Sequence, residues 1–377
     1  MKLFRQGVCF FLCFFLLISA YPAMAKPAAP TLDATSYLLM DASTGEVLLA
    51  QNENEERSIA SITKLMTVLL ILEDLESGKL SLSDQVTAST NASAMGGSQI
   101  FLKENEVMDV DTLLKSILVA SANDSCVAMA EHISGSESAF VERMNQRAKE
   151  LGLSATSYKN VHGLDKDGHF SSAIDVARLA REVLKYDTVR NYTGIWQEKI
   201  RNDTFELTNT NKLVRFYDGT TGLKTGSTTN AGCCLCATAK RNGMELISVT
   251  LNSPTDAARF TDGKKLLDYG FANYTLNTLA SKEEVMAEPK IPYAKKDTVA
   301  CYPKEDLHLL TLKDESITAT PRMEFYSVKA PLPQGSVIGK LIFEANGETV
   351  KETDLICKEE IPKQSWLDTV KEFLKVI

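Results

Sequence analysis

The sequence predicts an α+β protein that is followed by a small all-β domain. Segments with helical periodicity fill most of residues 62–184, and strand–turn–strand patterns stand before and after them. Beyond about residue 273, short runs of Val, Ile and Leu alternate with Pro, Gly and Lys, as in 336–344. This alternation is typical of short strands joined by turns. The length of 377 residues is enough for two domains.

Composition and charge are those of an ordinary globular protein. Hydrophobic residues make up 44% of the chain and charged residues 24%, with a formal net charge of −8. These proportions exclude a disordered chain, a collagen-like chain and a disulfide knot. Nucleic acid is not expected as a partner, because phosphate binding needs an excess of Lys and Arg.

Residues 1–25 have the pattern of a signal peptide. Lys2 and Arg5 give a basic start, residues 8–18 are almost entirely apolar, and Ala23-Met24-Ala25 places small residues before a cleavage site. The alternative is a retained membrane anchor, but the apolar run is short for a bilayer span. We therefore expect an exported protein at the outer face of the cytoplasmic membrane, in the periplasm or the cell-wall space.

The expected elements of the first domain, residues 26–272, follow in order. Its strands are expected at 36–40 and 46–50, around a polar turn, and at 233–240 and 244–251, around Arg241-Asn242-Gly243. Its helices are expected at 62–75, 111–120, 126–133, 139–151, 173–184 and 259–269. Because residues 62–75 are apolar nearly all round, that helix is expected in the middle of the domain.

Two further parts complete the chain, a β-rich domain at 273–361 and a C-terminal segment at 362–377. In the C-terminal segment one helical face would carry Trp366, Leu367, Val370, Phe373, Leu374 and Ile377. Such a face can pack on the protein itself. Its position at the chain end, its Trp and its lysines favour an amphipathic helix that lies in the membrane interface.

A possible nucleophile stands at the start of the central helix, in Ala60-Ser61-Ile62-Thr63-Lys64. Residues three apart in a helix share a face, so Ser61 and Lys64 are within reach of each other. A serine hydroxyl needs a neighbouring base, and lysine serves when its pKa is depressed. Taken alone, the motif is better explained by a Ser helix cap and a Lys that reaches solvent.

Two more short motifs follow. Ser121-Ala122-Asn123 lies in a polar break between two helices, where Ser and Asn often satisfy helix ends. Lys224-Thr225-Gly226-Ser227 precedes the predicted hairpin, where a Gly alone would only mark a bulge. Each is weak by itself. In this order, the three motifs are the signature of penicillin-interacting serine enzymes.

The sequence resembles the low-molecular-mass penicillin-binding proteins that are D-alanyl-D-alanine carboxypeptidases. The resemblance extends from about Thr31 to Ile377. Besides the three motifs it includes segments 36–51, 121–131, 162–165 and 259–269, together with the small β domain and the final helix. It implies a β-lactamase/transpeptidase-like catalytic domain, an antiparallel sheet flanked by helices. Members of this family often carry a Pro in the segment that is Arg57-Ser58-Ile59-Ala60 in this sequence.

The resemblance also implies an acyl-enzyme mechanism. Ser61 would attack the carbonyl between the last two D-alanines of a peptidoglycan stem peptide, and Lys64 would take its proton. Ser121 would relay a proton to the departing D-alanine, and Asn123 would orient Lys64 and the substrate amide. Water would then release the shortened peptide. β-Lactam antibiotics are expected as covalent inhibitors, and no cofactor or metal is required.

The remaining implied roles concern the substrate. Lys224 would keep the site positive, which helps to keep Lys64 neutral and attracts the terminal carboxylate. Thr225 and Arg259 would contact that carboxylate. The backbone N–H groups of Ser61 and Ser227 would form the oxyanion hole, whose donors each account for a few kcal/mol in comparable enzymes.

Other polar residues are expected to be structural. Because the implied base is a lysine, His162 is expected to have a structural role in a loop. Asp165 and Asp175 are expected to cap helices or to make contacts within loops. Cleavage of the leader removes Cys9 and Cys13 and leaves six cysteines. Residues 233, 234 and 236 cannot converge on one metal from a single strand, so buried thiols are expected there and at Cys126. Spacing leaves a Cys301–Cys357 disulfide open.

Two alternatives compete with the carboxypeptidase. A serine β-lactamase of the common class would use a Glu to activate water, and residues 162–172 contain none. It would also lack an appended β domain. A non-catalytic wall-binding or sensor protein of the same fold would not need Ser61, Lys64, Ser121 and Lys224 together.

Overall fold

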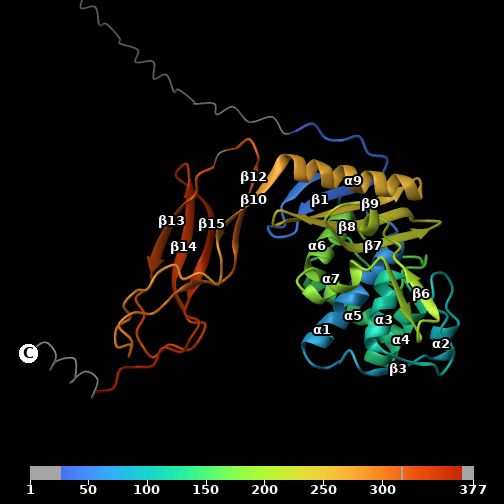
Figure 1. The fold of residues 1–377 in the computed structure, drawn as a ribbon, viewed down its shortest axis with the longest axis horizontal. Coiled ribbons are helices and arrows are strands. Elements are labelled where there is room, and N and C mark those ends of the chain that lie inside the picture. The colour runs from blue at the N-terminus through green and yellow to red at the C-terminus, as the bar shows by residue number, and fades with distance from the viewer. Residues whose placement is uncertain (1–26, 316, 367–377) are drawn as a thin grey trace, which may run out of the picture.

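The computed structural model describes residues 27–315 and 317–366. The predicted signal peptide, 1–25, and all but the first residues of the predicted amphipathic segment at 362–377 therefore lie outside the described residues. In the described ranges, no helix combines the length and the apolar character needed to cross a membrane. The chain forms a larger body of helices around a sheet and a smaller body of strands (Figure 1).

A five-stranded antiparallel sheet forms the centre of the larger body, in the order β2-β1-β9-β8-β7. Its strands are β1 (Ser36–Asp41), β2 (Val47–Gln51), β7 (Thr220–Thr228), β8 (Gly232–Arg241) and β9 (Met244–Ser253). Asn242 and Gly243 join β8 to β9 with φ angles of 49° and 84°. Two consecutive left-handed residues are what a type I′ hairpin requires, so the predicted hairpin is confirmed.

Helices cover both faces of this sheet (Figure 1). The helical elements are the 3₁₀ turn η1 (Ala60–Thr63), α1 (Lys64–Glu76), α2 (Thr90–Ser93), α3 (Val110–Val119), α4 (Asn123–Ser134), α5 (Glu137–Glu150), α6 (Ala173–Val183), α7 (Asp187–Thr193), α8 (Leu213–Phe216) and α9 (Asp256–Asn273). Two small two-stranded sheets, β3 (Gln85–Thr87) with β4 (Val107–Asp109) and β5 (Gln197–Ile200) with β6 (Phe205–Thr208), were not predicted.

The central helix lies where its composition requires. Every residue of α1 from Lys64 to Leu72 is buried, and α1 is enclosed by α3, α4, α5 and α6. Two predicted boundaries were wrong. α9 begins at Asp256 because the Thr255 hydroxyl accepts a hydrogen bond from the Ala258 N–H, and α4 begins at Asn123, inside the predicted polar break. A hydroxyl cap of this kind extends a helix into polar sequence.

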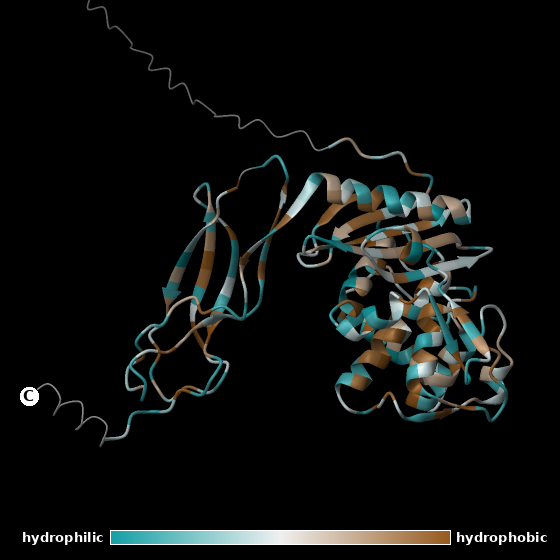
Figure 2. Ribbon diagram, in the orientation of Figure 1, coloured by the Kyte–Doolittle hydropathy of each residue, from teal (hydrophilic) through white to brown (hydrophobic). Residues whose placement is uncertain are grey.

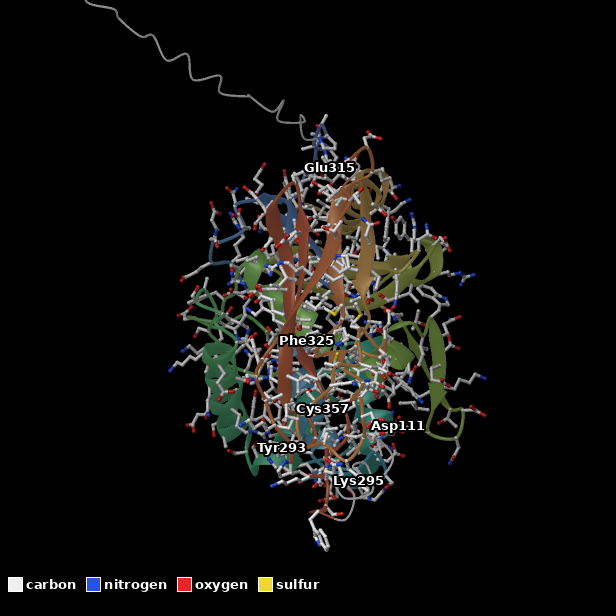
Figure 3. The ribbon with its side chains drawn as sticks, turned by 90° about the vertical axis from the view of Figure 1, so that its left-hand side faces the viewer. Asp111, Tyr293, Lys295, Glu315, Phe325 and Cys357 are labelled. Atoms are coloured by element: carbon white, nitrogen blue, oxygen red, sulfur yellow. The ribbon has the colours of Figure 1, made fainter. Side chains whose placement is uncertain are left out.

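The smaller body is built from strands, as predicted. They are β10 (Tyr274–Ala280), β11 (Tyr302–Pro303), β12 (Leu307–Leu312), β13 (Thr320–Phe325), β14 (Val337–Ala345) and β15 (Glu348–Ile356). β10 pairs with β12, and the other four strands form a sheet in the order β11-β15-β14-β13. Apolar side chains from these strands form the core of the smaller body (Figure 2). Tyr293 and Lys295 lie at the end of this body away from Glu315 (Figure 3).

The two bodies are joined without a linker. α9 ends at Asn273 and β10 begins at Tyr274. The contact continues in the side chains, because Leu310 of β12 belongs to the same hydrophobic cluster as Leu266 and Leu267 of α9. The Asn273 carbonyl also accepts a hydrogen bond from the Lys313 N–H.

The described cysteines are free thiols. Cys301 donates to the Ala287 carbonyl at 3.0 Å and Cys357 to the Pro333 carbonyl at 3.5 Å. The spacing of the cysteines left open whether Cys301 and Cys357 form a disulfide. In the structure their sulfur atoms are not bonded to each other. Across the described ranges, no three His, Cys, Asp or Glu side chains gather as a metal site would require.

Candidate active site

Ser61 lies in the 3₁₀ turn η1, directly before α1 rather than in the first turn of α1. Two glycines press on this turn. A Cβ on Gly163 would lie 1.9 Å from the Ala60 carbonyl oxygen, and a Cβ on Gly226 would lie 2.9 Å from the Ser61 nitrogen. Both positions therefore need glycine for close approach of the backbone.

The Lys64 ammonium group is buried among three oxygens. Its Nζ lies 2.8 Å from Ser61 Oγ, 2.7 Å from Asn123 Oδ1 and 2.7 Å from the His162 carbonyl oxygen. Burial lowers the pKa of Lys64 to about 8. A neutral amine has two N–H donors and one lone pair, and Asn123 and His162 offer acceptors only. The lone pair then faces Ser61 Oγ, the one neighbour that carries a proton.

Asn123 is the first residue of α4 and its amide is held at both ends. Oδ1 accepts from Lys64, and Nδ2 donates to the Gly96 carbonyl at 2.7 Å. The Asn123 backbone N–H donates to the Ser98 carbonyl at 2.7 Å. The loop at 96–98 thus fixes the side chain that orients Lys64.

Ser121 lies in the tight turn between α3 and α4, with a φ of +63°. Its side chain is nearly buried, and among the described residues its hydroxyl has no hydrogen-bond partner. The turn is held by the Ala122 N–H, which donates to the Ser116 carbonyl at 3.2 Å. A left-handed backbone at a non-glycine residue is uncommon and often marks a functional position.

Lys224 and Thr225 lie on β7, the edge strand beside the nucleophile turn. Lys224 is buried, and its Nζ donates to the Thr225 carbonyl at 3.0 Å. Burial, together with the charge of Lys64, lowers the pKa of Lys224. The two amines therefore disfavour simultaneous protonation. Thr225 Oγ1 donates to Thr210 Oγ1 at 2.7 Å, which fixes its hydroxyl at the edge of the sheet.

The last two predicted site residues, Ser227 and Arg259, have different environments in the structure. Ser227 is exposed on β7, beyond the close contact of Gly226 with Ser61. Arg259 is buried, and its Nη1 donates to the carbonyls of Gly226, at 2.9 Å, and Cys234, at 3.3 Å. Its guanidinium group therefore holds the backbone of β7 and β8.

Sequence reasoning missed the contribution of the His162 backbone. Its carbonyl accepts from Lys64, whereas its imidazole Nδ1 accepts from the Leu164 N–H at 3.2 Å. Burial lowers the pKa of His162 to about 3, so the ring is neutral at physiological pH. The predicted loop role of the side chain is confirmed. No side-chain signal could have indicated the carbonyl, since every residue type has one.

The two aspartates are loop partners, as expected. Asp165 accepts from Thr228 Oγ1 at 2.6 Å, which links its loop to the end of β7. Asp175 accepts from the Ala155 N–H at 2.8 Å and from Thr156 Oγ1 at 2.9 Å.

A serine, a buried lysine and an Asn-held turn next to the edge strand of an antiparallel sheet define the class of penicillin-interacting serine enzymes. Comparison with known proteins agrees. The profile of the D-alanyl-D-alanine carboxypeptidase family matches residues 23–255, and that of the penicillin-binding protein 5 C-terminal domain matches residues 274–363. The chain therefore belongs to the D-alanyl-D-alanine carboxypeptidase family of serine peptidases, as the resemblance implied.

Individual relatives cover most of the chain. The D-alanyl-D-alanine carboxypeptidase DacF of Bacillus subtilis is 40% identical over 344 residues, which is 90% of this chain and 88% of the relative. The crystal structure of penicillin-binding protein 5 from Haemophilus influenzae superposes with a TM-score of 0.75 at 30% identity, covering 89% of this chain and all of that one. Penicillin-binding protein D2 from Listeria monocytogenes, solved with ampicillin bound, has a TM-score of 0.60 at 30% identity and covers 65% of this chain and all of that one.

Proposed function

We propose that this protein removes the terminal D-alanine from peptidoglycan stem pentapeptides through an acyl-enzyme on Ser61. The observation that supports this most directly is the 2.8 Å contact between Lys64 Nζ and Ser61 Oγ, with both other Nζ neighbours acting only as acceptors. This geometry directs the lysine lone pair at the serine proton. A base in hydrogen-bond contact with the nucleophile is the requirement for nucleophilic catalysis.

In acylation, the Lys64 amine takes the Ser61 proton while Oγ bonds to the carbonyl carbon of the penultimate D-alanine. The carbonyl oxygen becomes an oxyanion, which the backbone N–H groups of Ser61 and Ser227 would stabilise. The carbon–nitrogen bond then breaks, and the proton on Lys64 passes through the Ser121 hydroxyl to the departing amine. The unpartnered hydroxyl of Ser121 is suited to this relay. Water later hydrolyses the ester.

The substrate carboxylate would be bound at β7. The Thr225 hydroxyl is the direct contact in this proposal, and the charge of Lys224 supplies the attraction. A bound carboxylate stabilises the protonated form of Lys224, which in turn favours neutral Lys64. The guanidinium group of Arg259 is buried and donates to backbone carbonyls of β7 and β8. We therefore propose that Arg259 contributes positive charge and supports the backbone of β7, and that it does not contact the substrate directly.

β-Lactams would acylate the same serine, a proposal supported by the ampicillin-bound relative. The pattern of residues 1–25 supports export, and Trp366 at 73% exposure supports a contact between the C-terminal segment, 362–377, and the outer face of the cytoplasmic membrane. The substrate would then be peptidoglycan in the adjacent space.

The test uses two substrates and one variant. The protein is incubated with a fluorescent penicillin and, separately, with a peptide that ends in Lys-D-Ala-D-Ala. We expect a long-lived label that Ser61→Ala abolishes, and release of D-alanine. Rapid penicillin turnover without D-alanine release would show a β-lactamase instead. A folded protein that gives neither label nor release would be a non-catalytic binding protein, and the proposal would be wrong.

A further inference from the structure

A buried series of hydrogen bonds leads from Lys159 to η1, the turn that carries Ser61. The backbone N–H of Lys159 donates to Nδ1 of His169 at 3.1 Å. Nε2 of His169 lies 2.7 Å from Thr63 Oγ1, and Thr63 Oγ1 donates to the Ala60 carbonyl at 2.8 Å. This series, called here the His169 relay, ends on the residue directly before Ser61.

The direction of the relay is fixed at both ends. A backbone N–H can only donate and a backbone carbonyl can only accept, so the Lys159 N–H places a lone pair on Nδ1. A neutral imidazole with an accepting Nδ1 carries its proton on Nε2. His169 therefore donates to Thr63, and Thr63 donates to Ala60. His169 and Thr63 are both buried, so water does not replace either partner.

The relay acts on a strained part of the chain. Ala60 has a φ of +48°, a conformation that an alanine rarely adopts. Such a residue persists only where its surroundings hold it, and it often marks a functional site. Thr63 directly precedes α1, but its side chain makes no cap hydrogen bond to that helix. Its hydroxyl serves the Ala60 carbonyl instead.

We infer that His169 and Thr63 are positioning residues for acylation, which hold the Ala60 carbonyl so that Ser61 Oγ stays in line with Lys64. The inference rests on the proposed function, in which Ser61 is the nucleophile. Neither side chain touches the reacting atoms. Both act through the Ala60 carbonyl oxygen, which also lies directly against Gly163.

A purely stabilising role is the alternative. It predicts that loss of the relay lowers the unfolding temperature and leaves the acylation rate of the folded protein unchanged. A positioning role predicts a lower acylation rate constant with unchanged penicillin binding, because the recognition groups on β7 are untouched. The two roles therefore differ in one measurable quantity.

The experiment compares two matched pairs in the full-length protein. Thr63→Val keeps the shape and removes the hydroxyl, and its control Thr63→Ser keeps the hydroxyl. His169→Phe removes the Nε2 donor, and its control His169→Gln keeps an N–H in its place. Stopped-flow acylation by a fluorescent penicillin separates the binding constant from the acylation rate constant, and circular dichroism reports folding.

We expect acylation by Thr63→Val and His169→Phe to be about 10- to 100-fold slower, the scale of a misplacement near 1 Å, at unchanged binding constant. Thr63→Ser and His169→Gln should recover most of the rate. Wild-type acylation rates in folded Thr63→Val or His169→Phe overturn the inference and leave the proposed function standing. Equal losses in Val and Ser, or in Phe and Gln, overturn it too. A wild-type protein that is not acylated overturns both.

Discussion

Gly163→Ala tests whether the loop at residues 162–165 sets the position of the nucleophile. An added Cβ would lie 1.9 Å from the Ala60 carbonyl oxygen and 2.4 Å from its carbon. Nonbonded carbon and oxygen atoms rarely approach within about 3 Å, so the loop and the turn must separate by about 1 Å. That displacement predicts about 10²-fold slower acylation. The φ of +90° adds a backbone cost of about 1 kcal/mol.

Gly152→Ala separates the clash from the backbone cost. Gly152 also has a positive φ, +68°, but an added Cβ would meet no atom within 4 Å. This variant should lose about 1 kcal/mol of unfolding free energy and acylate at the wild-type rate.

The assay is acylation by a fluorescent penicillin, read together with denaturant unfolding. A folded Gly163→Ala that acylates like the wild type would refute the reasoning, since the Ser61–Lys64 geometry would then tolerate movement of the turn. A slow Gly152→Ala would also refute it, because a backbone effect far from the site would be enough to slow the reaction.

Three other outcomes follow from the structure. Because the proposed base is the neutral amine of Lys64, whose pKa burial lowers to about 8, the acylation rate should rise with pH through a midpoint of about 8, and a flat profile would contradict the proposal. Phe140→Ala, in the fully buried core of α5, should cost about 3–5 kcal/mol in denaturant unfolding with acylation unchanged; a small loss would mean that the site collapses around the gap. Alkylation of denatured, unreduced protein should modify Cys301 and Cys357 in full, which mass spectrometry checks, and a pair protected until reductant is added would show a disulfide.

Patterns of apolar residues predicted most of the fold because buried positions recur at regular intervals along helices and strands. The nearly continuous apolar run of α1, the two short apolar runs of β1 and β2 around a polar turn, and the Asn-Gly turn of the β8–β9 hairpin each have one favoured structure. The strand pairs β3–β4 and β5–β6 were missed, since strands of three or four residues are too short to show an alternation of apolar and polar residues. The start of α4 was missed because Asn123 is polar and acts inside the site.

The site was predictable only where side chains carry the chemistry. Ser61, Lys64 and Asn123 come together as their motifs indicated. The third partner of Lys64 is a backbone carbonyl, and the left-handed conformations of Ala60 and Ser121 are set by tertiary packing. Neither a backbone carbonyl contact nor a left-handed conformation at Ala or Ser is indicated by the type of the residue. The burial of Arg259 and its hydrogen bonds to the carbonyls of Gly226 and Cys234 are equally a result of tertiary packing.

The direct passage from α9 into β10 bears on where the enzyme can work. With no loop between α9 and β10, and with Leu310 in the same hydrophobic cluster as Leu266 and Leu267 of α9, the β-rich body is attached directly to the larger body and not through a flexible tether. A tether would let the catalytic serine sample a broad volume around its point of attachment. A direct attachment instead restricts where that serine can lie relative to the end of the β-rich body that carries Tyr293 and Lys295 (Figure 3). With the C-terminal segment, 362–377, at the membrane, as proposed, trimming would be confined to the layer of peptidoglycan that the catalytic body reaches from that attachment.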